Sequence, residues 1–157
     1  MEHVHYYDTC IRWEADRKGT ARSSVLDQSI EVATPPEFAK GMPGIWSPEH
    51  LFVAAVNSCL MTTFLAVAEN FKLEFSHFES HAKGKLEIVD KKFMMSEVVL
   101  RPIVHVASEA DVEKAMKVLH KSEAACLISN SIKSTIVFEP EVLVQTALES
   151  EVVELQS

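Results

Sequence analysis

Residues 48–70 constrain the fold more than any other stretch, because they predict a long helix that is apolar on nearly every side. Ser47 is a favourable N-cap, Pro48 suits the first helical position, and Glu49 suits the positive end of the helix dipole. The helix is predicted to run from Pro48 to about Asn70. A helix with no polar face needs cover on all sides, so we expect it to be central and buried.

The same stretch does not predict a membrane span. Four polar residues interrupt its apolar run, which favours a core helix: Asn57, Ser58, Thr62 and Thr63. The N-terminus shows no basic segment followed by an apolar one, so no secretory signal is expected. We therefore expect a cytoplasmic protein without a membrane partner, in which three cysteines, an odd number, do not form a structural disulfide framework.

Strand patterns precede the helix. Residues 3–34 alternate or are rich in β-branched and aromatic side chains, and they predict three short strands. The first two are separated by a turn at residues 16–19, and the last two meet at Asp27. Three prolines and two glycines make residues 35–46 a loop, which we expect to be able to cover a site.

Strands and helices also follow it. Residues 71–90 and 91–107 predict an antiparallel hairpin, and Ser108 is expected to cap a second helix. A third helical turn is expected near Cys126, before β-structure at residues 134–145. The predicted order is β-β-β-α-β-β-α-α-β, an α+β fold with the central helix packed on antiparallel sheets. We expect a single domain over residues 1–157, ending in an acidic tail from about 146 to 157.

Charge and composition exclude several functions. The chain has 15 lysines and arginines against 23 acidic residues, for a net charge of −8. A nucleic-acid partner needs a basic face, so none is expected. With four glycines and no glycine-rich phosphate loop, the chain is expected to bind no nucleotide cofactor. His77 and His81 have no third ligand at metal-site spacing, so we expect no metal.

The cysteines leave two interpretations open. Cys59, in the middle of the central helix, is either an inert core residue or a nucleophile. It lies about three turns from the helix N-terminus, so the dipole stabilises its thiolate little and a cation is needed. Cys126 lies near an expected helix start, where backbone N–H groups favour a thiolate, although a packed apolar role is the alternative. Cys10 lies in the first strand and is expected to be structural.

Two motifs resemble those of a known family. PEHLFVAAVNSCLMTTF, residues 48–64, is similar to the central-helix motif of the osmotically inducible protein C/organic hydroperoxide resistance (OsmC/Ohr) family. CLISNSIKSTI, residues 126–136, resembles its second cysteine motif, and residues 13–32 fit its N-terminal strands. The resemblance covers about residues 6–145. Two departures indicate a less-studied branch: Ile45-Trp46-Ser47 before Pro-Glu, and Leu127 where proline often follows the second cysteine.

The resemblance implies thiol-dependent reduction of organic hydroperoxides. By analogy, Cys59 is the peroxidatic nucleophile and Cys126 the thiol that resolves its sulfenic acid to a disulfide. An external dithiol is then the reductant, with no bound cofactor. The family also implies that an arginine from the N-terminal strands, held by Glu49, activates the nucleophile. Arg17 and Arg22 both lie in that segment, and we favour Arg17 because it stands in the turn.

Spacing on the helix predicts a homodimer. Glu49 and Cys59 are ten residues apart, which separates them by about 15 Å along the axis and about 80° around it. If both serve one site, Glu49 comes from a second subunit or acts through a long arginine. An intertwined homodimer is also what the resemblance implies. The alternative function is a non-catalytic protein of the same family that binds a small apolar ligand at the dimer interface.

Overall fold

A computed structural model describes residues 3–145, so the expected tail at 146–157 lies outside the described residues. Contacts along the chain divide it into two compact units, residues 1–52 and residues 53–157. The prediction of a single domain stays a prediction.

The N-terminal unit is built on a three-stranded antiparallel sheet of β1 (Cys10–Ala15), β2 (Lys18–Arg22) and β3 (Ile30–Ala33), in that order. The turn between β1 and β2 is confirmed, and Asp16 takes a positive φ of 47° in it. The connection between β2 and β3 is longer than the predicted junction at Asp27, because strand pairing stops at Arg22 and resumes at Ile30.

The expected loop after β3 folds back on the strand. The N–H of Met42 donates to the carbonyl of Thr34 at 2.9 Å, and the N–H of Ala33 donates to the carbonyl of Trp46 at 2.8 Å. Ser47 then starts α1 (Pro48–Asn70), as predicted. Its hydroxyl accepts the backbone N–H of His50 at 3.2 Å, which satisfies one of the free donors of the first turn.

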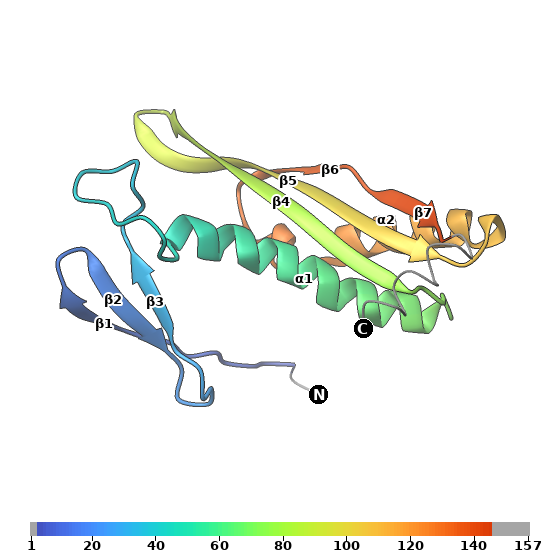
Figure 1. Cartoon of the computed structure of the whole chain (residues 1–157), viewed down its shortest axis with the longest axis horizontal. Coiled ribbons are helices and arrows are strands. Elements are labelled where there is room, and N and C mark those ends of the chain that lie inside the picture. The colour runs from blue at the N-terminus through green and yellow to red at the C-terminus, as the bar shows by residue number, and fades with distance from the viewer. Residues whose placement is uncertain (1–2, 146–157) are drawn as a thin grey trace, which may run out of the picture. The chain divides into compact units, whose positions relative to one another are not determined.

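The C-terminal unit contains the long hairpin of β4 (His77–Val89) and β5 (Lys92–Val106), drawn in green and yellow in Figure 1. Asp90 and Lys91 have positive φ values of 48° and 66°. Two such residues make a tight turn whose twist matches that of the strands. The predicted hairpin and its turn are therefore confirmed.

The last two strands show that the prediction of antiparallel sheets is only partly right. β6 (Thr135–Phe138) and β7 (Glu141–Val144) both pair with β5, and both run parallel to it. The chain crosses over through α2 (Val112–Ala125) before it returns, which makes the sheet mixed. The expected final strand is split in two, because Pro140 has no N–H to give to the ladder.

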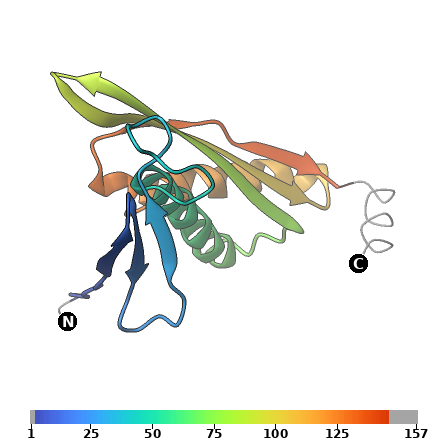
Figure 2. The ribbon, with the colours of Figure 1, turned by 60° about the vertical axis from the view of Figure 1, so that its left-hand side comes forward.

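Both helices cover one face of this sheet, as Figure 2 shows. Ser108 precedes a 3₁₀ turn at Glu109–Asp111, and α2 follows it. The third helical turn expected near Cys126 forms as a second 3₁₀ turn, at Ser129–Ser131. The core lies between helices and sheet and consists of Phe64, Ala68, Leu73, Val104, Val106, Ala115, Val118 and Leu119.

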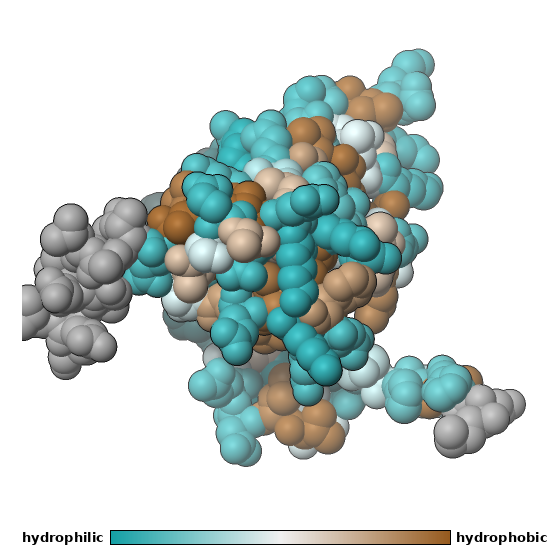
Figure 3. Space-filling view, turned by 90° about the vertical axis from the view of Figure 1, so that its right-hand side faces the viewer, coloured by the Kyte–Doolittle hydropathy of each residue, from teal (hydrophilic) through white to brown (hydrophobic). Residues whose placement is uncertain are grey.

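α1 is buried on one face only, which corrects the expectation that it is covered on all sides. Its fully buried residues are Val56, Leu60, Phe64 and Ala68. Met61 is 41% and Leu65 45% exposed, and apolar side chains also reach the surface in Figure 3. Length and apolar composition would also suit a membrane span, but the buried face packs as a core helix does. Met61 and Leu65 mark the open face of α1.

Candidate active site

The C-terminal unit brings the two predicted reactive cysteines together. Cys59 is half-buried on α1, and Cys126 is fully buried where α2 ends. Both are free thiols, and the side chains form a hydrogen bond with each other. The hydroxyl of Thr63, one turn after Cys59, lies 3.9 Å from its sulfur. Two thiols that lie 67 positions apart in the sequence therefore interact in the fold.

The surroundings of Cys59 favour its thiolate. Burial alone raises the pKa of the Cys59 thiol, because a charged sulfur loses its water. Hydrogen bonds outweigh that effect and leave the pKa below its ordinary value. They come from the backbone N–H of Ile128, the thiol of Cys126, the hydroxyl of Thr63 and the backbone N–H of Leu127.

Cys126 is shifted in the opposite direction. Burial raises the pKa of its thiol, and the neighbouring Cys59 raises it further, while the hydroxyl and N–H of Ser129 offset part of the shift. The sequence predicts that backbone N–H groups at the start of a helix favour the thiolate of Cys126. That expectation is wrong, because Cys126 follows the end of α2 and the N–H groups of the next two residues donate to Cys59.

This pair can carry out a defined chemistry. A thiolate is the nucleophilic form of cysteine, so Cys59 is the sulfur that can attack an electrophile. The protonated Cys126 can supply a hydrogen bond in the first step and a thiol in the second. Because the two thiols interact in the fold, Cys126 is the thiol available to form a disulfide with Cys59.

Glu49 lies in the N-terminal unit, in the first turn of α1. Its Oε2 atom is buried, and within residues 3–145 it has no hydrogen-bond partner. A buried carboxylate oxygen without a partner is costly, so a protein retains one where a cation or donor completes it. Glu49 thus has a free carboxylate oxygen that could accept a hydrogen bond from an arginine.

The two candidate arginines of the same unit differ in their surroundings. Arg17 lies in the exposed turn between β1 and β2, where its carbonyl accepts the N–H of Thr34 at 3.2 Å. It lines a hollow of about 600 Å³ together with Asp16, Lys40 and Met42. In the described part of the chain its guanidinium forms no ion pair.

Arg22 lies at the end of β2, and it already has an acidic neighbour. The pKa of Glu14 is lowered first by its hydrogen bond from Thr20, and further by the charges of Lys18 and Arg22. Within the described residues neither guanidinium forms an ion pair, and the two differ in that the charge of Arg22 acts on Glu14.

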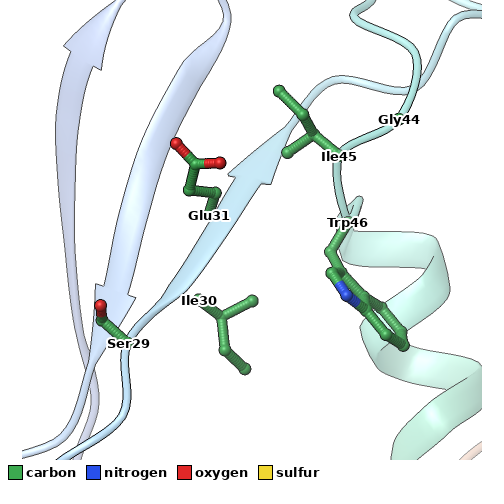
Figure 4. Close-up of a pocket in the computed structure, with 6 residues that line it drawn as sticks. All are labelled: Ser29, Ile30, Glu31, Gly44, Ile45 and Trp46. Carbon is green, nitrogen blue, oxygen red and sulfur yellow. The ribbon is translucent and has the colours of Figure 1, made fainter.

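A shallow hollow of about 360 Å³ also lies in the N-terminal unit (Figure 4). It is formed by the end of the loop and by the start of β3, and its lining residues are Ser29, Ile30, Glu31, Gly44, Ile45 and Trp46. Trp46 is 52% exposed, and its ring meets that of His50 edge-on at 6.2 Å. The hollow offers a mixed polar and apolar surface, with one carboxylate, to a small molecule.

Sequence reasoning did not identify three of the groups that contact Cys59. Thr63 carries a readable signal, since it stands four residues after Cys59 on a helix and so on the same face. Leu127 and Ile128 carry none, because they act through backbone N–H groups that every non-proline residue has. Only the path of the chain after α2 shows where those groups point.

Comparison with protein-family models matches residues 41–141 to the OsmC-like proteins, and the chain belongs to that family. The protein YmaD of Bacillus subtilis, which is uncharacterised, is 27% identical over 146 residues, covering 90% of this chain and 95% of YmaD.

Solved structures share the fold. An OsmC-like protein of unknown function from Vibrio cholerae aligns with a TM-score of 0.77 at 23% identity, over 87% of this chain and 99% of its own. An organic hydroperoxide resistance protein from Elizabethkingia anophelis, solved with thiocyanate bound, aligns with a TM-score of 0.73 at 21% identity, over 92% and 100%. The predicted α+β, OsmC-like fold and the family resemblance are confirmed.

Proposed function

We propose that the protein is a cysteine-based peroxidase of the cytoplasm that reduces organic hydroperoxides in defence against oxidative stress. One observation carries the proposal: two cysteines in contact have pKa shifts of opposite sign, so one is prepared as a nucleophile and the other as a thiol donor. The name of the Elizabethkingia neighbour, an organic hydroperoxide resistance protein, supports the same reaction.

The reaction balances with these two sulfurs. The thiolate of Cys59 attacks the outer peroxide oxygen, the O–O bond breaks, and the organic alkoxide leaves and takes a proton to become an alcohol. Cys59 is then a sulfenic acid. The thiol of Cys126 displaces its hydroxyl as water and forms the Cys59–Cys126 disulfide, which an external dithiol reduces in two exchange steps. No resident cofactor takes part.

Arg17 and Glu49 complete the proposed site. A guanidinium near Cys59 would stabilise the thiolate and donate hydrogen bonds to the peroxide, because it is always charged and has several donors. The buried free oxygen of Glu49 supports its role as the group that holds this arginine. Arg22 is the weaker candidate because Glu14 already lies near it.

The first test counts thiols. Adding a slight excess of cumene hydroperoxide to the reduced protein is expected to remove two free thiols per chain, while Cys10 stays free. Cys59→Ser should keep its remaining thiols, and Cys126→Ser should lose only that of Cys59, as a trappable sulfenic acid. If the wild type keeps all of its thiols, the protein is not a peroxidase of this kind.

We further propose that the protein is a homodimer paired along the open face of α1. Replacing Leu65, which is 45% exposed on this face, by lysine should place charge in the interface and yield monomers. Sedimentation of the wild type and Leu65→Lys measures the change, with Lys117→Ala on exposed α2 surface as the control. A wild-type monomer that is fully active would contradict the pairing.

The alternative function is the binding of a small apolar ligand without catalysis. The hollow beside Trp46 favours it, since it presents isoleucine and tryptophan side chains to solvent. Quenching of tryptophan fluorescence by a small aromatic ligand, together with unchanged thiols in the cumene hydroperoxide assay, would select this function over the peroxidase.

A further inference from the structure

Two consecutive peptide groups after α2 present their N–H groups to Cys59. The first peptide group joins the carbonyl of Cys126 to the N–H of Leu127. The second joins the carbonyl of Leu127 to the N–H of Ile128. Both N–H groups donate to the sulfur of Cys59. In a trans peptide the N–H and the C=O point in opposite directions, so whatever holds the carbonyl also aims the N–H.

Both carbonyls accept hydrogen bonds from residues that follow in the chain. The backbone N–H of Asn130 donates to the carbonyl of Cys126 at 3.1 Å. The hydroxyl of Ser131 donates to the carbonyl of Leu127 at 2.7 Å. A hydrogen bond to a carbonyl also polarises its peptide and strengthens the bond that the N–H makes. The first donor is a backbone N–H group, but the second is a side-chain hydroxyl that a substitution can remove.

We propose that Ser131 is a positioning residue for Cys59: its hydroxyl holds the Leu127 carbonyl, so that the Ile128 N–H points at the sulfur of Cys59 and helps to stabilise its thiolate without the arginine. The inference rests on the proposed function only for its catalytic meaning, since the thiolate exists without peroxide. Within the described residues, the titratable group that contacts Cys59 is the thiol of Cys126. The other contacts are neutral: Thr63 and the two N–H groups.

Ser131 is suited to a clean test. Its side chain is exposed and makes its hydrogen bond at the surface, so removal of the hydroxyl leaves no cavity in the core. Leu127 is also exposed, and a proline in its place would delete one N–H donor while keeping the chain neutral. Cys126, the residue before it, has a ψ of 108°, a value that a following proline tolerates.

The experiment measures the pH dependence of Cys59 alkylation by iodoacetamide, read on the Cys59 peptide by mass spectrometry in the reduced, full-length protein. A charge-assisted hydrogen bond that is lost or misdirected should raise the midpoint by about 0.5–1 pH unit in Ser131→Ala. Leu127→Pro should raise it by about 1 unit for the same reason. Ser131→Thr, which keeps the hydroxyl, should restore the wild-type midpoint.

Two controls make the outcome decisive. Ser76→Ala, which removes a surface hydroxyl bound to Gln145, should leave the midpoint unchanged. The Ser131→Ala shift should also persist in an Arg17→Gln background. An unchanged midpoint in Ser131→Ala, an equal shift in Ser131→Thr, or a shift that vanishes without Arg17 would overturn the proposal. Since no peroxide is present, failure of the peroxidase function leaves this result intact, and the reverse also holds.

Discussion

Cys59→Ser should lower the rate of cumene hydroperoxide reduction, with dithiothreitol as the reductant, by at least about 10³-fold. A serine hydroxyl is not ionised at neutral pH, so the groups that stabilise the thiolate have no anion to stabilise. The rate is followed as loss of peroxide under steady-state conditions. Because serine is nearly isosteric with cysteine at this half-buried position, the fold should be retained, and circular dichroism checks that it is.

The chain supplies a matched control in its third cysteine. Cys10 is exposed at the start of β1, so Cys10→Ser should retain the wild-type rate. Cys126→Ser keeps the nucleophile but loses the resolving thiol, and its first turnover should proceed while later ones depend on direct reduction of the sulfenic acid. More than a tenth of the wild-type rate in Cys59→Ser would exclude Cys59 as the nucleophile.

The parts of the fold that the sequence predicts are those with local signals. The residues Ser47-Pro48-Glu49 predict the start of α1. The alternation of side chains stops at Asp90, which predicts the turn of the hairpin. The direction of β6 and β7 has no such signal. Their pairing with β5 is decided by where α2 delivers the chain, which is a property of the whole unit and not of any short segment.

The site divides in the same way. The two cysteines follow from their motifs, and their contact confirms that the motifs belong together. The choice of which cysteine is the thiolate does not follow from local sequence. Position along a helix favours Cys126, but burial and backbone donors reverse the order. Backbone N–H groups are the same in every non-proline residue. The stabilisation of the Cys59 thiolate by the N–H groups of Leu127 and Ile128 could therefore not be predicted from the sequence.

The second large effect is expected at Arg17. Arg17→Met should lower kcat/KM for cumene hydroperoxide by about 10²–10³-fold, the usual effect of removing a donor that stabilises developing charge. Methionine keeps much of the apolar stem but has neither charge nor donors. Arg22→Met is the matched control, and it should stay within about a factor of two, because an exposed charge pair contributes little. Stopped-flow oxidation of Cys59 measures both.

Glu49 decides whether the arginine acts alone or as part of a held pair. If Glu49 orients Arg17, Glu49→Gln should lower kcat/KM in the wild type but have little further effect in Arg17→Met, since nothing is left to orient. Additive losses in the double variant would mean that the two residues act separately. Equal losses in Arg17→Met and Arg22→Met would contradict the assignment of Arg17, because they would show that a charge already acting on Glu14 matters as much as that of Arg17.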